Sequence, residues 1–170
     1  MDRLLITGGH RLQGTVPVSG AKNSALKLMA ASLLAQGRTV LTNVPRIADV
    51  FTMIDVLRHV GASVDFVGDV MEIDVPGQLH SEAPYELVHR MRASVNVLGP
   101  LLARQGHARV AMPGGCNIGS RPLDLHEEAL ARMGASFHFD HGYLEGMTSG
   151  LAGRRIVPRR AVSPASRWRL

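Results

Sequence analysis

The strongest constraint on the fold is a pattern that the chain contains twice. Residues 33–40 read LLAQGRTV, and residues 101–110 read LLARQGHARV. Each predicts a helix end, a glycine stop and the start of a strand. Residues 57–63 and 130–136 form a second matching pair, in which a helix again ends at a glycine. The copies are offset by about 70 residues, and repeats of this kind are supersecondary modules that bury their apolar faces against one another.

Each copy continues into two short strands joined by a tight turn. In the first copy the strands are predicted at residues 64–67 and 70–75, and in the second copy at residues 137–140 and 143–147. The complete unit is therefore helix, strand, helix, strand, strand. Two such units predict an α/β fold in which the units pack on each other.

Apolar residues at three- and four-residue spacing predict the buried faces of the two helices in the first copy. The first helix has this spacing at Ala25, Leu28, Met29, Ser32 and Leu33. The second helix has it at Phe51, Ile54, Leu57 and Val60. A further strand segment, around residues 4–7 and 14–18, precedes the first copy and belongs to neither copy.

No third copy begins near residue 150. Residues 153–170 contain Pro158, Pro164 and scattered arginines, and no amphipathic helix is visible among them. A core built for more units would be left partly uncovered. The exposed surface between units therefore predicts self-association.

Composition restricts the classes of function. No apolar run reaches the ~20 residues of a membrane span, and the first residues lack the pattern of a secretory signal. The single cysteine, Cys116, cannot form an internal disulfide, so we expect a cytoplasmic protein. The net charge is +5, but residues 151–170 contain six arginines and no acidic residue, which leaves −1 for residues 1–150. The body has no basic surplus for nucleic acid, and the tail is interpreted as a solvated, disordered extension.

Residues 19–24, SGAKNS, place Lys22 and Asn23 at the start of the first helix. Helix N-termini present free N–H groups and a partial positive charge, and Lys22 adds a full charge. The segment can form a phosphate or carboxylate site, but its spacing alone favours a capped surface helix with a solvated lysine. The glycine spacing of a Walker loop is absent.

Residues 91–94, MRAS, open the first helix of the second copy, where Arg92 takes the place of Lys22 in the first. A basic group at a helix N-terminus interacts unfavourably with the helix dipole, which destabilises the helix by a few tenths of a kcal/mol. Stability alone therefore does not explain Arg92. Ligand binding and simple exposure are the two interpretations.

Residues 113–125 link a strand to a helix and contain three glycines together with Cys116. Such a loop allows close approach of the backbone to a ligand, and Arg121 can stabilise the Cys116 thiolate. A cysteine between glycines in a polar loop is poorly placed for packing, so we interpret Cys116 as reactive. Asp124 can cap the next helix or bind a ligand hydroxyl. The eight histidines lack metal-ligand spacing, and His126 is expected on a helix surface.

Six motifs, taken in order and spacing, resemble the UDP-N-acetylglucosamine 1-carboxyvinyltransferases, which are relatives of EPSP synthase. The motifs are LQG at 12–14, SGAKN at 19–23, NVP at 43–45, MRAS at 91–94, LGPL at 98–101 and PGGCNIGSRPLDLH at 113–126. The resemblance covers about residues 1–157. It implies transfer of the enolpyruvyl group of phosphoenolpyruvate to the 3-hydroxyl of UDP-N-acetylglucosamine, the first committed step of peptidoglycan synthesis, without a metal or cofactor.

The fold that the resemblance implies is an inside-out α/β barrel of two domains, each with three repeated units. Residues 22–157 would supply two units of one domain, whereas residues 1–21 would belong to the other domain. Residues 158–170 would form a divergent basic tail. Partners other than the two substrates, including nucleic acid and membranes, are not expected.

The resemblance also assigns roles to individual residues. Cys116 would be the catalytic proton donor, would form a covalent adduct with phosphoenolpyruvate and would be alkylated by fosfomycin. Phosphoenolpyruvate would be bound by Lys22, Asn23 and Arg121. UDP-N-acetylglucosamine would be bound by Asn23, Arg92, Arg121, Pro122, Leu123, Asp124 and Leu125.

Two departures from the family pattern affect the expected activity. Family members are much longer, and the remainder carries a second domain with further arginines and a carboxylate base. After Val157 the sequence leaves the family pattern, which we interpret as a frame-shifted or foreign tail. We therefore expect weak or no transferase activity. The alternatives are a non-catalytic fragment that binds UDP-sugar or phosphoenolpyruvate, and a nucleic-acid binder that acts through the arginine tail.

Overall fold

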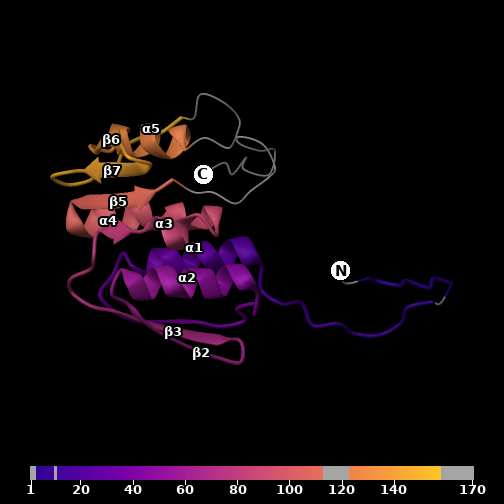
Figure 1. Ribbon diagram of the computed structural model, residues 1–170. Helices are drawn as coiled ribbons and strands as arrows, with labels where there is room; N and C mark the ends of the chain where they lie inside the picture. The colour runs from indigo at the N-terminus through magenta and orange to yellow at the C-terminus, as the bar shows by residue number, and fades with distance from the viewer. Residues whose placement is uncertain (1–2, 10, 113–122, 158–170) are drawn as a thin grey trace.

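The computed structural model describes residues 3–9, 11–112 and 123–157, in which two units follow each other along the chain (Figure 1). The first unit comprises α1 (Lys22–Ser32), β1 (Gly37–Leu41), α2 (Ala48–His59), β2 (Ser63–Val67) and β3 (Val70–Val75). The second unit comprises the 3₁₀ helix η1 (Arg92–Val97), α4 (Leu98–Gln105), β5 (His107–Ala111), α5 (Asp124–Arg132), β6 (Ser136–Asp140) and β7 (Tyr143–Met147). The predicted order of helices and strands is confirmed in both copies.

The two units also share one strand order. In the first sheet β3 lies between β1 and β2, and both pairings are antiparallel. In the second sheet β7 lies between β5 and β6 in the same way. The strand that follows the tight turn is thus central in each unit. The repeat in the sequence is therefore a repeat of topology.

Glycines end the helices where the sequence predicts. Gly61, Gly106 and Gly134 have φ values of 107°, 68° and 110°, in the left-handed region that favours glycine. The Gly106 N–H donates a hydrogen bond of 3.0 Å to the Leu102 carbonyl, which closes the last turn of α4. Gly61 and Gly134 are at matching positions, and so α2 and α5 turn into the next strand in the same way.

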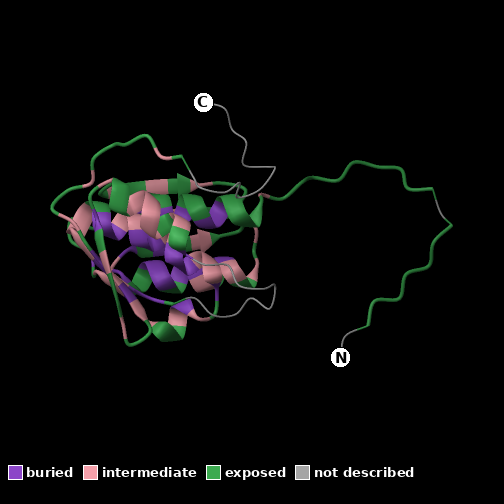
Figure 2. Cartoon of the chain, turned by 90° about the horizontal axis from the view of Figure 1, so that it is seen from above, coloured by how far each residue is buried: buried purple, intermediate pink, exposed green. Residues whose placement is uncertain are grey.

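Helices α1, α2 and α4 lie in a layer between the two sheets, whereas α5 lies on the other side of the second sheet (Figure 1). α1 and α2 pack on the first sheet, α4 packs on β5 and β7, and both α1 and α2 contact η1. Buried residues are concentrated in this layer (Figure 2). The largest fully buried side chains include Leu26, Met29, Leu33, Leu98 and Leu101. Burial of one such side chain contributes about 1.5–3 kcal/mol, so the helical layer is the main source of stability.

Seven of the nine positions predicted to be buried in the first two helices are buried, and Leu28 and Phe51 are the two exceptions. Leu28 is 53% exposed and Leu26 is only 1% exposed. In α2, Phe51 is 42% exposed, whereas Val50 and Met53 are fully buried. Each helix contacts a sheet on one side and a neighbouring helix on another, which buries a wider stripe than a single-face spacing assumes.

The second unit begins with a 3₁₀ helix that the sequence analysis did not predict. Pro100 explains it, because proline has no N–H to donate to Asn96 and its ring would clash with that carbonyl in a longer α-helix. α4 starts at Leu98, which places Pro100 in the first turn, where no intrahelical donor is needed. η1 carries the chain from Arg92 to that point.

The connection between the units contains two short elements that the sequence analysis also missed. β4 (Glu82–Ala83) pairs in parallel with β5, where it opposes Arg109 and Val110. α3 (Tyr85–Val88) packs against α2, β5 and η1. Both elements are too short to show a hydrophobic period, and their formation depends on the neighbours that they contact.

The described part of the segment before α1 forms no strand, contrary to the prediction. Residues 3–9 and 11–18 leave the body as an exposed arm (Figure 2). Its large apolar side chains, Leu4, Leu5, Ile6, Leu12, Val16 and Val18, are all at least 82% exposed. The apolar pattern favours a strand, but a strand also needs a hydrogen-bonding neighbour, and the described residues provide none. The assignment of this segment to another domain stays a prediction, and residues 158–170 lie outside the described residues.

Arg104 of α4 ties the second unit to the first. Its guanidinium donates hydrogen bonds to the carbonyls of Leu33 at 3.2 Å, Pro76 at 3.0 Å and Gly77 at 2.8 Å. Leu33 caps the C-terminal end of α1, where carbonyls lack intrahelical donors. One cationic side chain therefore satisfies acceptors from two segments of the first unit.

We expect Arg104→Met to lower the free energy of unfolding by about 1.5–3 kcal/mol, because hydrogen bonds from a charged donor are lost while the apolar stem is kept. Urea unfolding followed by circular dichroism measures this change. The matched control is Arg38→Met, since Arg38 pairs with Glu72 on the surface of the first sheet. Its expected effect is below about 1 kcal/mol. Equal losses in both variants would contradict the bridging role of Arg104.

Candidate functional site

Lys22 and Asn23 lie in the first turn of α1, as predicted. Ala21 precedes the helix and has no side chain that could cap it, and the first turn contains no acidic residue. The free N–H groups and partial positive charge of the helix end therefore share one turn with the exposed Lys22 and Asn23 side chains. A phosphate or a carboxylate fits such a site.

Lys22 meets a carboxylate from the next helix. Its Nζ lies 2.7 Å from Asp49 Oδ2, and the two side chains are 52% and 35% exposed. Asp49 belongs to the first turn of α2. The ion pair therefore joins the N-terminal ends of α1 and α2.

Asn43 fixes the chain that enters α1. Its Oδ1 accepts a hydrogen bond from the Gly20 N–H at 3.0 Å, and its Nδ2 donates to the Val18 carbonyl at 3.5 Å. Asn43 has a φ of 55°, which asparagine adopts more readily than most residues. A Cβ at position 20 would lie 2.0 Å from the Asn43 carbonyl oxygen, so glycine is required there. The SGAKN and NVP motifs thus meet in space and set the start of α1.

A second cluster forms where η1 and α5 begin. Arg92 is the first residue of η1, and Asp124 and His126 lie in the first turn of α5. The pKa of His126 is lowered, first by loss of water around the partly enclosed ring and next by the positive charge of Arg92. Asp124 acts in the opposite direction, and Lys27 of α1 adds to the lowering. Arg92, Asp124 and Lys27 therefore all lie close enough to His126 to influence its pKa.

The start of α5 corrects one expectation. Asp124 is the first helical residue and Leu123 holds the capping position, so Asp124 is not the side-chain cap. Leu123 is 3% exposed and packs in the core, which anchors the start of the helix. Leu125 is half-buried and Asp124 is exposed, and the binding of a ligand hydroxyl by Asp124 stays a prediction.

Three of the predicted site residues, Cys116, Arg121 and Pro122, lie outside the described residues. Their roles stay predictions. The described residues on either side are Met112, which follows β5, and Leu123, which precedes α5.

Ser94 is an unusual residue of the MRAS motif. Its hydroxyl is fully buried and has no hydrogen-bond partner in the described part of the chain. The buried Ser32 of α1, by contrast, donates to the Met29 carbonyl at 2.7 Å. An unpaired buried hydroxyl costs about 1–3 kcal/mol. The start of η1 thus combines Arg92 at its first position with a buried hydroxyl that has no partner among the described residues.

A pocket of about 350 Å³ lies beside the Lys22 turn. It is formed by the start of α1 and by the strand β1 with the residues that follow it, and its lining includes Gly20, Ala21, Ser24, Leu28 and Asn43. Backbone groups at the helix start and the Ser24 hydroxyl supply its polar groups, and Leu28 supplies part of its apolar wall. We take this pocket as part of the candidate site.

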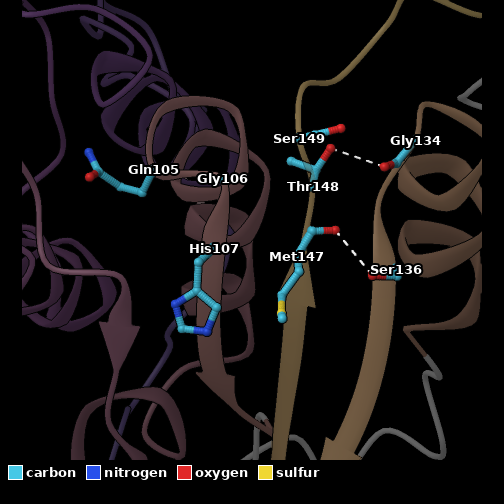
Figure 3. Close-up of a pocket in the computed structure, with 8 residues that line it drawn as sticks. All are labelled: Gln105, Gly106, His107, Gly134, Ser136, Met147, Thr148 and Ser149. Carbon is cyan, nitrogen blue, oxygen red and sulfur yellow. Dashed lines mark hydrogen bonds between the residues drawn. The ribbon is translucent and has the colours of Figure 1, made fainter.

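A second, open groove of about 730 Å³ lies where α4 and β7 end and where β5 and β6 begin (Figure 3). Its lining includes His107, Ser136 and Thr148 but none of the predicted site residues. The Thr148 hydroxyl donates to the Gly134 carbonyl at 3.0 Å, and the Ser136 hydroxyl donates to the Met147 carbonyl at 3.4 Å. These hydroxyls are engaged in holding turns, so the groove is a poorer candidate.

Within the described ranges, no three His, Cys, Asp or Glu side chains come together in a way that could hold a metal ion. No described helix is long and apolar enough to cross a membrane. What the described residues offer is two places where a basic group and a helix start can hold an anion, at Lys22 and at Arg92.

The comparison with known families identifies the family of the chain. The family model of EPSP synthase (3-phosphoshikimate 1-carboxyvinyltransferase) matches residues 6–163. The chain belongs to this family. Named relatives are more specific. The UDP-N-acetylglucosamine 1-carboxyvinyltransferase of Lawsonia intracellularis is 52% identical over 156 residues, and that of Gluconacetobacter diazotrophicus is 51% identical over 160 residues.

These relatives confirm the resemblance that the motifs indicated, and they are transferases by name. The alignments cover 92% of this chain but only 37% and 38% of the two relatives. The chain thus spans well under half the length of the proteins it matches. The activity of the complete relatives is therefore not carried over to this chain directly.

Solved structures confirm the fold class. The enolpyruvyl transferase NikO from Streptomyces tendae superposes with a TM-score of 0.70 at 26% identity, over 85% of this chain and 32% of NikO. EPSP synthase from Acinetobacter baumannii gives a TM-score of 0.60 at 19% identity, over 83% of this chain and 33% of that chain, which supports the fold alone. The chain therefore has part of an enolpyruvyl transferase fold.

Sequence reasoning missed Asp49, His126 and Lys27 as neighbours of the site. Each lies on a helix whose position depends on packing between elements that are distant in the chain. Asn43 carried a usable signal, since an asparagine two residues before a proline, between a strand and a helix, is typical of a tight turn. Its hydrogen bonds to the SGAKN segment could not be read from the sequence.

We expect Arg92→Gln to raise the pKa of His126, because the cation that opposes protonation of the ring is removed. The folded protein binds this proton less readily than the unfolded chain does, so the wild-type protein loses stability as the pH falls below about 6.5. Arg92→Gln should lose less stability than the wild type over the same fall in pH. NMR titration of the ring and urea unfolding at pH 7.5 and 5.5 measure both effects. Arg38→Gln is the control, and a His126 pKa that is unchanged in Arg92→Gln would contradict the cluster.

Proposed function

We propose that this chain forms one wall of an enolpyruvyl transferase site that uses phosphoenolpyruvate and UDP-N-acetylglucosamine in peptidoglycan synthesis. The reaction places the enolpyruvyl group on the 3-hydroxyl of the sugar and releases phosphate. The observation that carries the proposal is the pair of basic side chains, Lys22 and Arg92, at the start of the first helix in each unit of a chain about 50% identical to enzymes of that name.

Each residue has a separate task in the proposed reaction. Lys22 and Arg121 bind the phosphate of phosphoenolpyruvate, and Cys116 protonates its methylene carbon. The adjacent carbon then has oxocarbenium character and is attacked by the sugar hydroxyl, which loses its proton to a base. Phosphate leaves, a proton is lost from the former methylene carbon, and the double bond forms again. Cationic groups on the phosphate stabilise the charge that develops as it departs.

The nucleotide sugar occupies the second basic cluster. Arg92 binds the diphosphate, and its positive charge already lowers the pKa of the nearby His126. Asn23 contacts the sugar, and residues 122–125 line the uracil site, with the anchored Leu123 as their fixed point. The burial of Leu123 supports this assignment, because a residue held in the core gives the exposed Asp124 a defined position.

The chain by itself is proposed to be weakly active or inactive. α2 buries Val50, Met53, Ile54, Val56 and Leu57, whereas its counterpart α5 has no fully buried residue among those described. The second unit therefore lacks the cover that the first unit has. Transfer also requires groups that act only when a site is closed from both sides. A fragment that binds UDP-sugar or phosphoenolpyruvate without catalysis is the second candidate, and the uncovered α5 favours it.

Binding of UDP-N-acetylglucosamine tests the site. In calorimetry on the 170-residue chain, we expect Arg92→Gln to weaken binding by roughly 10-fold or more, since a hydrogen bond from a charged group is worth about 1.5–3 kcal/mol. Arg38→Gln, on the far sheet, should bind as the wild type does. Unchanged affinity in Arg92→Gln, or no binding by the wild type, would contradict the proposed nucleotide site.

Turnover separates the two candidates. Phosphate release from phosphoenolpyruvate and UDP-N-acetylglucosamine is expected to stay at or near background for this chain and for Cys116→Ala. Wild-type turnover that disappears in Cys116→Ala would show that the chain is active alone, and would overturn the assignment as a weakly active or inactive form.

A further inference from the structure

The N-terminal ends of α1 and α2 share one carboxylate. Asp49 Oδ2 lies 2.7 Å from Lys22 Nζ, with Lys22 at the first position of α1 and Asp49 in the first turn of α2. Three sources of positive charge converge there: the ammonium group and the two helix ends. A carboxylate in this position satisfies the same groups that an incoming anion would use.

The ion pair is held from both sides. Asn43 fixes the backbone before α1 through Gly20 and Val18, so the first turn of α1 has a defined position. Asp49 is held by α2, whose Val50 and Met53 are fully buried. Neither partner can move far without disturbing its helix. Contact or loss of contact therefore depends on the side chains of Lys22 and Asp49.

We propose that Asp49 is a positioning residue that competes internally for Lys22 with the anionic ligand. In the empty site it holds the ammonium group at the start of α1, and it releases that group when a phosphate arrives. The inference rests on the proposed role of Lys22 in binding phosphoenolpyruvate. It adds that Asp49 of α2 keeps the affinity for phosphoenolpyruvate below the value that Lys22 would give without it.

The competition has a definite size and sign. Pairs that are about half exposed, as this one is, contribute little in water. Removing the carboxylate charge should therefore tighten binding of phosphoenolpyruvate by roughly two- to six-fold. A purely structural carboxylate predicts the reverse, because its loss would loosen the helix ends and weaken binding.

The test is a titration of the 170-residue chain with phosphoenolpyruvate, followed by calorimetry. Asp49→Asn should bind more tightly than the wild type, and Asp49→Glu, which restores the charge, should return toward wild-type affinity. The matched control is Glu72→Gln, which breaks the Arg38–Glu72 pair on the first sheet and should leave the affinity unchanged. The gain in Asp49→Asn should shrink as salt is raised, since the effect is electrostatic.

A second measurement uses the wild type and avoids any doubt about folding. The carboxyl carbon of Asp49 should shift in the NMR spectrum on saturation with phosphoenolpyruvate, and this shift should be absent in Lys22→Met. Unchanged or weaker binding by folded Asp49→Asn, or a static Asp49 signal, would overturn the inference. Equal phosphoenolpyruvate binding by wild type and Lys22→Met would instead refute the proposed role of Lys22, which is a separate failure.

Discussion

Packing of the first helix of each unit against the other unit is the contact on which the rest of the molecule depends. α1 and η1 meet between the two sheets, and Leu26, Met29, Val97 and Leu98 are almost completely buried there. Both segments begin with a basic residue. The apolar contact between these segments therefore also fixes the positions of Lys22 and Arg92 relative to each other.

Much of the fold could be predicted because its signals are local. Glycines at positive φ end the helices, and the alternation along β3 places Met71, Ile73 and Val75 on the buried face. The duplicated pattern then gave the order of elements twice. The predictions that failed concern segments whose structure depends on contacts with other parts of the chain. Pro100 changed the start of the second unit, and the arm before α1 has strand-forming residues but no described strand beside it.

The candidate site was predictable in part for the same reason. Lys22, Asn23, Arg92 and Asp124 could be found because each opens a helix, which the sequence marks clearly. Asp49, which pairs with Lys22, and His126, whose pKa is affected by Arg92 and Asp124, could not be found from the sequence. Both residues come near the predicted residues only because their helices pack there. Lys22 is paired with Asp49, so its charge is partly neutralised before any ligand arrives. The proposed anion binding by Lys22 is therefore an exchange of one partner, Asp49, for another.

The two units share one core and are expected to unfold together. Native-state hydrogen exchange at increasing urea tests it directly, at the amides of Ile73 in β3 and Leu144 in β7, which are central strands of the two sheets. If the units form one cooperative body, both amides should exchange with the same opening free energy and the same dependence on urea. A lower opening free energy at Leu144 than at Ile73 would show that the second unit unfolds alone, and would contradict the account.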